Sequence, residues 1–105
     1  MKVTFKNWVC DVWFSKYMLD DSLFIGLTDA EDGSPIAVAT VCVGHVKPRE
    51  GCVLIKNYAE NEGILEALVA AKIIDYPQAE YKISNYAWAQ ECKLLVTPVL
   101  GGKLS

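Results

Sequence analysis

The sequence predicts a small α+β fold: an antiparallel sheet of about five or six strands with one main α-helix, about residues 59–72, packed on one face. Three observations predict it. One long segment in the second half of the chain has the apolar periodicity of an amphipathic helix. Most other apolar residues fall in short runs rich in β-branched and aromatic side chains, as in strands. Turn-forming residues separate those runs, so neighbouring strands can pair as hairpins.

The predicted helix lies within NYAENEGILEALVAAKII, residues 57–74. Its apolar stripe recurs at helical spacing and consists of Ile64, Leu65, Leu68 and Ala71. Asn57 and Asn61 are both candidates for the N-cap, and the sequence does not choose between them. Gly63 would destabilise the helix interior by up to about 1 kcal/mol, unless it lies near the start or lets a neighbouring element approach closely.

The end of the helix is predicted near residue 71 or 72. Pro77 prevents much continuation beyond that point. Ile73 or Ile74 could then fold back on Leu68, which is the apolar contact of a common C-terminal cap.

The first strand region changes its apolar parity. Apolar residues fall on odd positions up to Phe5 and on even positions from Trp8 to Phe14. One face cannot stay buried along a regular strand with this pattern. We therefore expect a β-bulge or a tight turn at Asn7.

The clearest hairpin joins residues 23–28 to residues 36–43. Its turn contains Asp32-Gly33, a strong short-range hairpin signal. Residues 36–43 are apolar on both faces, so we expect them to form the central strand, with the helix lying across it. A final hairpin is expected to turn near Ser84-Asn85. The remaining strands are predicted at residues 52–56, 80–84 and 86–95.

Length and composition fit one domain, which we place at residues 1–95, with residues 96–105 as a loosely attached C-terminal tail. No apolar run approaches the roughly 20 residues of a membrane span, and the N-terminus lacks the apolar core of a signal peptide. We therefore expect a cytoplasmic protein, in whichever cell makes it, with no membrane partner. The net charge of −3 and the scattered bases provide no basic stripe, so no direct nucleic-acid partner is expected.

The four cysteines lie among apolar strand residues, and we expect buried free thiols at Cys10, Cys42, Cys52 and Cys92. No two of them have the spacing of a zinc finger or ribbon, so no metal site is predicted. His45 lies between Cys42 and Cys52, which suggests a Cys–His nucleophile, but Cys42 falls on an apolar strand and nothing in the sequence supplies a third group to orient the pair. We therefore predict no catalytic residue, no cofactor and no enzymatic activity.

Four stretches stand out together: KVTFKNW at residues 2–8, the hairpin DAEDGSPIAVATV, KNYAENEGILEAL at residues 56–68, and the closing CKL at residues 92–94. In order and spacing they resemble a family of small, functionally uncharacterised proteins carried by phages, plasmids and other bacterial mobile elements, over about residues 2–95. The resemblance implies a mobile-element accessory protein but brings no activity with it. The chain departs from the family pattern at Ala59, where a capping serine is expected, and at Lys72, where a glycine would suit the helix end.

Aromatic residues are numerous for so short a chain, with three tryptophans and five tyrosines. Both types are enriched at binding hot spots, although they are also ordinary large residues of strands. Our candidate binding residues are Tyr76, Tyr86 and Trp88, which flank the helix exit and the last hairpin.

The leading hypothesis is a non-catalytic protein-binding module that occludes a host or phage protein. Given the setting implied by the resemblance, an anti-defence inhibitor of the anti-CRISPR kind is one form of it. The alternative is a small-molecule-binding sponge with an aromatic-lined pocket. In either case an exposed edge strand would allow a homodimer.

Overall fold

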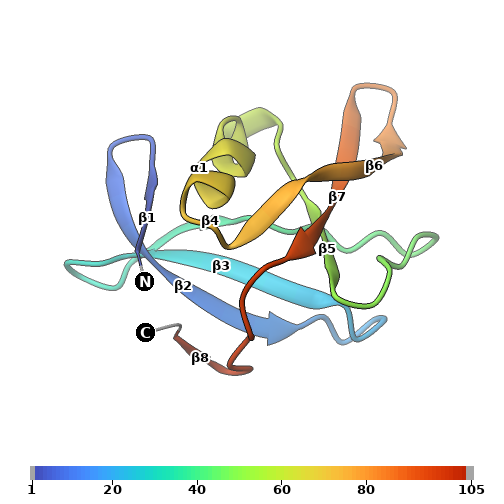
Figure 1. Ribbon diagram of the computed structural model, residues 1–105. Helices are drawn as coiled ribbons and strands as arrows, with labels where there is room; N and C mark the ends of the chain where they lie inside the picture. The colour runs from blue at the N-terminus through green and yellow to red at the C-terminus, as the bar shows by residue number, and fades with distance from the viewer. Residues whose placement is uncertain (1, 104–105) are drawn as a thin grey trace.

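A computed structural model describes residues 2–103 and confirms the α+β class and the antiparallel strand pairing. Within these residues the strands form two sheets instead of one (Figure 1). The first sheet contains β1 (Lys2–Phe5), β2 (Trp8–Lys16), β3 (Leu23–Asp29) and β4 (Pro35–Val38) in the order β1-β2-β3-β4, and a fifth strand, β8 (Gly102–Lys103), pairs with β2 off this path. The second sheet has the order β5-β7-β6 and consists of β5 (Cys52–Ile55), β6 (Ile74–Ser84) and β7 (Ala87–Leu94).

The prediction that residues 36–43 form the central strand is wrong. Only the start of this segment belongs to a strand, and that strand, β4, is the last one in its sheet. The chain then crosses between the sheets: the Ala39 N–H donates to the Ile25 carbonyl of β3, and Thr40 forms an isolated bridge with Ile55 of β5. The segment is apolar on both faces because it contacts both sheets, and this crossing is what divides the strands into two sheets.

The predicted turns are confirmed. β1 and β2 form a hairpin whose two-residue turn is Lys6-Asn7, which resolves the change of parity. The turn between β3 and β4 contains Asp32-Gly33, where Gly33 has a positive φ of 76°. The last hairpin joins β6 to β7 through Asn85-Tyr86. β6 begins at Ile74, earlier than predicted, and so it includes Pro77.

The helix is shorter than the predicted residues 59–72. A 3-10 turn, η1 (Ala59–Asn61), comes first, and α1 (Ile64–Ala70) begins after Gly63, whose φ of 97° interrupts the helical path. The capping oxygen comes from Asn57: its Oδ1 accepts the N–H groups of Gly63 and Leu65 at 3.1 and 3.0 Å. Asn61 is buried and donates its side-chain amide to a carbonyl of β4 instead.

The C-terminal end of α1 is a Schellman motif. The Ile73 N–H donates to the Leu68 carbonyl and the Lys72 N–H donates to the Val69 carbonyl, both at 3.0 Å. Ile73 and Leu68 are fully buried in the same core cluster, as the predicted apolar contact requires. Lys72 adopts a left-handed φ of 61°, a conformation that glycine accommodates more easily.

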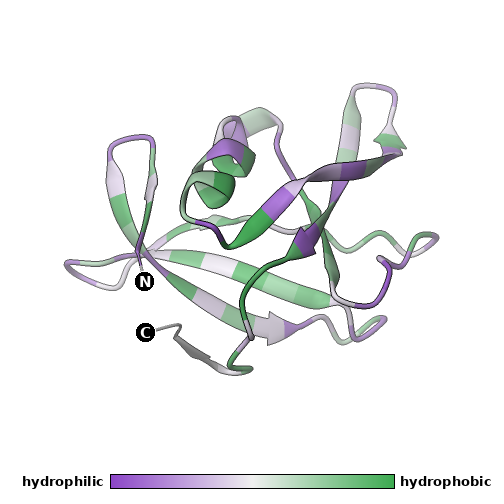
Figure 2. Ribbon diagram, in the orientation of Figure 1, coloured by the Kyte–Doolittle hydropathy of each residue, from purple (hydrophilic) through white to green (hydrophobic). Residues whose placement is uncertain are grey.

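The main core lies between the two sheets and under α1. The helix buries Ile64, Leu65 and Leu68 and contacts β1 and β6. Figure 2 shows α1 and β3 coloured mostly as hydrophobic. The four cysteines are free thiols: Cys10 and Cys92 are buried as predicted, whereas Cys42 and Cys52 are only half-buried.

The C-terminal segment contacts the first sheet. β8 (Gly102–Lys103) pairs antiparallel with β2, and the Gly101 N–H donates to the Phe14 carbonyl at 2.8 Å. The segment predicted to be a loosely attached tail, residues 96–105, is therefore held by backbone hydrogen bonds up to Lys103, and its last two residues lie outside the described range.

Candidate functional site

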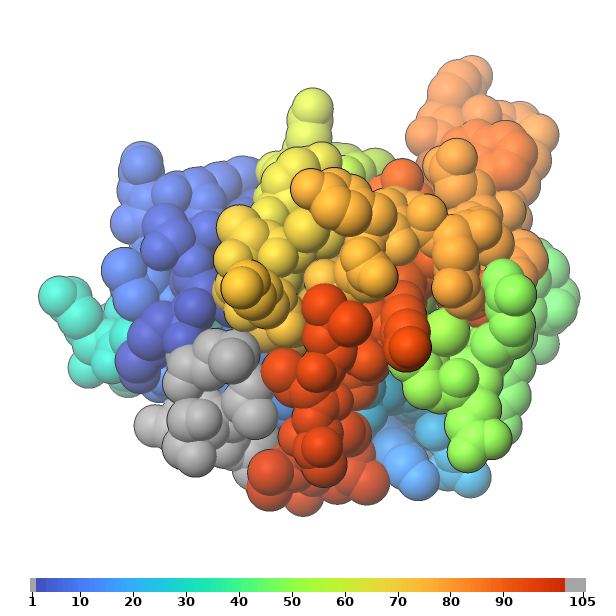
Figure 3. All heavy atoms as spheres, viewed as in Figure 1, coloured from blue at the N-terminus to red at the C-terminus, as the bar shows by residue number. Residues whose placement is uncertain are grey.

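The three predicted binding residues lie on the β6–β7 hairpin. Tyr76 on β6, Tyr86 in the turn and Trp88 on β7 are 72%, 96% and 49% exposed. The outer end of this hairpin rises from the body of the molecule as a separate orange knob at the upper right of Figure 3. All three side chains are therefore accessible from outside.

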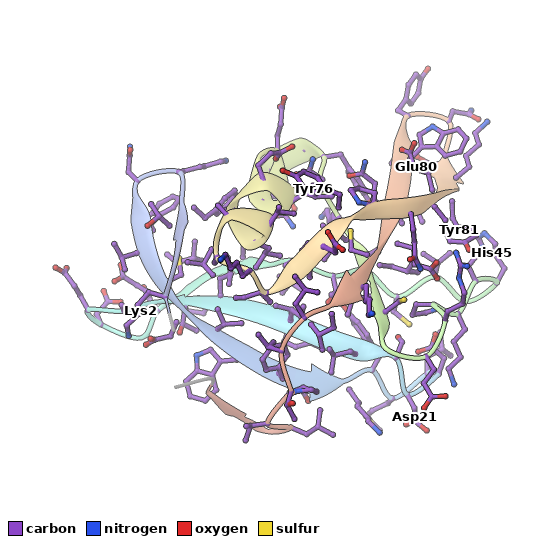
Figure 4. The ribbon with its side chains drawn as sticks, viewed as in Figure 1. Lys2, Asp21, His45, Tyr76, Glu80 and Tyr81 are labelled. Atoms are coloured by element: carbon purple, nitrogen blue, oxygen red, sulfur yellow. The ribbon has the colours of Figure 1, made fainter. Side chains whose placement is uncertain are left out.

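The three residues do not form one cluster within the chain. In the β6–β7 ladder Lys82 pairs with Trp88, close to the turn that holds Tyr86. Tyr76 lies about six residues before Lys82, which is roughly 20 Å at the rise of a strand. In Figure 4 Tyr76 lies beside α1, while Glu80 and Tyr81 lie farther along β6 towards the turn. We call the turn end, residues 82–88, the hairpin tip; Tyr86 and Trp88 belong to it and Tyr76 does not.

Strand alternation explains which aromatic residues of the hairpin face outward. Directly paired residues of an antiparallel ladder share one face of the sheet. Tyr81 pairs with Ala89, and both pack in a small apolar cluster with Leu54. Trp88 pairs with Lys82 on the opposite face, where both are exposed. The same ladder therefore places Tyr81 inward and Trp88 outward.

A buried carboxylate, Glu91, holds the other end of the hairpin. Its side chain is fully buried, its Oε2 accepts the Arg49 backbone N–H at 2.9 Å, and its Oε1 accepts the Arg49 Nε at 2.8 Å and the Gln78 amide at 3.1 Å. Burial by itself raises the pKa of Glu91, but the hydrogen bonds from Arg49 and Gln78 outweigh it, and the pKa is lowered from the usual 4.5. This ion pair fastens the loop between β4 and β5 to the second sheet.

Sequence reasoning missed Glu91 and Arg49. The signal was present in the alternation of β7, because Glu91 follows the buried Ala89 by two positions and so shares its inward face. A charged residue at an inward position indicates a buried partner. The partner itself, 42 residues earlier in the chain, has no local signal.

Two cavities lie away from the hairpin tip. The larger, about 640 Å³, is bordered by the ends of β2 and β7 and by the loop before β5. The charged residues that line it are Lys16, Asp21, Lys47, Arg49 and Glu50. The smaller, about 480 Å³, lies beside β4 and η1, where the Tyr17 hydroxyl is 3.1 Å from Thr40 Oγ1. Tyr17 is the one aromatic residue that lines either of these two cavities.

The geometry around the cysteines does not favour nucleophilic chemistry. The Cys42 thiol lies 3.6 Å from Asp20 Oδ1 as a donor. Burial and the charge of Asp20 raise the pKa of Cys42, whereas a nucleophilic thiol needs a lowered pKa. Among residues 2–103 there is no group of three or more histidine, cysteine or acidic side chains that could hold a metal ion. The described part of the chain also contains no helix with the length and hydrophobicity needed to cross a membrane.

Comparisons of the chain with protein-family models, with curated proteins and with solved structures find no match. The protein has an α+β fold that exposes aromatic side chains at one end of a paired hairpin and holds the opposite end through the buried carboxylate of Glu91, which pairs with Arg49.

Proposed function

We propose that this protein is a non-catalytic protein-binding module that contacts its partner through the hairpin tip. The observation that carries the proposal is the exposure of Tyr86 and Trp88 at the outer end of two paired strands. Tryptophan and tyrosine offer large contact areas with few rotatable bonds, and they dominate binding hot spots. The paired strands also limit the conformational entropy that these residues lose on binding.

The opposite end of the hairpin supports this role. Glu91 and Cys92 are fully buried there, and β7 pairs with β5 as well as with β6 over its last residues. A tip that extends from such an anchored base keeps its direction relative to the core. A partner therefore meets a preorganised surface, which lowers the free-energy cost of binding.

The identity of the partner is a further part of the proposal and depends on the resemblance to mobile-element proteins alone. In that setting the partner is a host or phage protein, encountered in the cytoplasm of the host cell. Binding occludes a functional surface of that protein, as an anti-defence inhibitor of the anti-CRISPR kind would do. No catalytic step and no cofactor are needed for this mode of action.

In the first step of the test, the tagged protein is used as bait to capture partners from a lysate of the native host, and mass spectrometry identifies them. The purified partner is then titrated with Tyr86→Ala and Trp88→Ala variants. Each variant is expected to weaken binding by about tenfold or more. The matched control is Trp8→Ala, since Trp8 is 43% exposed beside the β1–β2 turn, and its effect should stay within about twofold. Equal losses for Trp8→Ala and Trp88→Ala, or the recovery of no partner, would contradict the proposal.

The alternative function, a small-molecule sponge, is favoured by one observation, the cavity of about 640 Å³, which is within the usual size of ligand sites. Its lining contains no aromatic residue, so the aromatic-lined form of this hypothesis gains no support from it. An anion in this cavity would instead be recognised by Lys16 and Lys47, because the guanidinium of Arg49 is already paired with Glu91. Native mass spectrometry of the purified protein, with ligand-dependent thermal stabilisation, would detect it.

A further inference from the structure

β6 is an edge strand with one side available for pairing. In the order β5-β7-β6 it is the last strand, and within residues 2–103 its strand partner is β7 alone. It is 11 residues long, and its ladder with β7 is regular from Ala79 to Lys82, between irregular pairings on either side. An exposed edge of this length presents backbone donors and acceptors that another extended strand can satisfy.

We propose that β6 pairs antiparallel with β6 of a second copy of this chain, around a two-fold axis at Tyr81. A two-fold axis perpendicular to the sheet keeps each face of the sheet on its own side, so the residue at the axis pairs with itself. Glu80 then lies directly opposite Lys82 of the second copy, and Lys82 lies opposite its Glu80. Both side chains are exposed in one chain, and the two-fold axis produces this oppositely charged pair twice.

Charge selects this register over its neighbours. An axis at Glu80 would place two glutamates directly opposite each other, and an axis at Lys82 would place two lysines opposite each other. Like charges at directly paired positions destabilise a ladder. With the axis at Tyr81, the half-buried Ala79 and Ile83 also pair across the interface, so the apolar positions of the two strands coincide as well.

The dimer has one consequence for the candidate binding residues, and this consequence rests on the proposed function. With the axis at Tyr81, the antiparallel arrangement brings the turn of one copy, which holds Tyr86, towards the start of β6 of the other copy, which holds Tyr76. These two exposed tyrosines are separated by most of β6 within a single chain. The second copy would therefore join the helix-exit residue to the hairpin tip and form two equivalent aromatic surfaces.

Self-association is measured by sedimentation velocity on the full chain at concentrations from about 10 µM to about 1 mM, because an interface built on one edge strand is small and weak. We expect a monomer–dimer equilibrium in this range. A protein that stays monomeric throughout would overturn the proposal.

Charge exchange tests the register. Glu80→Lys and Lys82→Glu each put like charges opposite one another, and each should weaken the dimer by about tenfold. The double variant Glu80→Lys/Lys82→Glu recreates both pairs and should return to within about threefold of the original affinity. Glu31→Lys, an exposed reversal in the β3–β4 turn, is the matched control and should leave the affinity unchanged. Thermal unfolding of every variant verifies that it is folded.

Two results would overturn the proposed register: single reversals that dimerise like the original protein, or a folded double variant that fails to recover. These results are distinguishable from failure of the proposed function. A monomeric protein that binds its partner through Trp88 would exclude the dimer and retain the binding module. A protein that dimerises but whose partner binding is insensitive to Trp88→Ala would retain the dimer and exclude the proposed binding surface.

Discussion

The base and the tip of the β6–β7 hairpin belong to one ladder but differ in their surroundings. At the base, residues 90–92 of β7 pair with β5 on one side and with β6 on the other. At the tip, Ala87 and Trp88 pair with β6 alone. The base is buried and the tip carries the exposed Tyr86 and Trp88. Packing on both sides therefore constrains the residues of the base, whereas the residues of the tip can carry a binding surface without disturbing the core.

The chemistry of the base follows from this burial. Ile74 and Cys92 are fully buried, and burying an apolar side chain of this size contributes about 1.5–3 kcal/mol. Burial raises the pKa of the Cys92 thiol to about 12, so the thiol stays neutral at physiological pH. Glu91 remains charged at the same depth because Arg49 and Gln78 hydrogen-bond to it. The base therefore combines apolar packing with one paired charge.

The largest change in the free energy of unfolding is expected when the Glu91 carboxylate is removed. Glu91→Ala leaves the donors of Arg49 and Gln78 without their acceptor and opens space at the base, which should lower the free energy of unfolding by about 3 kcal/mol. Urea denaturation measures it. The control is Glu80→Ala, an exposed position on the neighbouring strand, with an expected change within about 0.5 kcal/mol. Similar losses for the two variants would remove the distinction between the base and the exposed strand.

The contribution of Glu91 to stability should also depend on pH. The pKa of Glu91 is lowered in the folded protein, so its stabilising contribution is present above the ordinary pKa of 4.5 and is lost as the pH falls through the lowered folded value. Glu91→Gln lacks this contribution at every pH. We therefore expect the difference in unfolding free energy between the original protein and Glu91→Gln to be constant from about pH 6 to 8 and to shrink below about pH 4.5. A difference that persists unchanged into acid would contradict this role.

A smaller change, a gain in the free energy of unfolding, is expected at Lys72, where α1 leads into β6. Lys72 holds a left-handed φ of 61° in the Schellman motif. Lys72→Gly relieves this strain and should raise the free energy of unfolding by about 0.5–1 kcal/mol. Lys72→Ala removes the same charge but not the strain, so it serves as the control and should give no such gain. Thermal and urea unfolding of the two variants decide between relief of strain and loss of charge.

Local chemistry in the sequence predicted the turns and the ends of the helix. Asp32-Gly33 and the parity change at Asn7 located two hairpins, and the apolar contact of Ile73 with Leu68 located the helix end. These features depend on residues only a few positions apart. The capping role of Asn57 was one of two open alternatives, because its choice depends on where η1 ends.

The features that the sequence did not predict depend on distant contacts. Residues 36–43 are apolar on both faces, and a central strand and a segment crossing between two sheets produce the same pattern. Tyr76, Tyr86 and Trp88 were expected to lie near one another, but β6 begins at Ile74, so Tyr76 is separated from the turn by most of an extended strand. Whether they bind a partner stays a prediction.

The smallest change in stability is expected at the tip. Tyr86 is 96% exposed in the turn, so Tyr86→Ala removes little buried surface and should change the free energy of unfolding by less than about 0.5 kcal/mol. The same variant is expected to weaken partner binding by about tenfold or more. Loss of binding without loss of stability would separate function from folding at a single residue, which no substitution at the base can do. A loss of stability above about 1 kcal/mol would show that the tip, like the base, is part of the folded core.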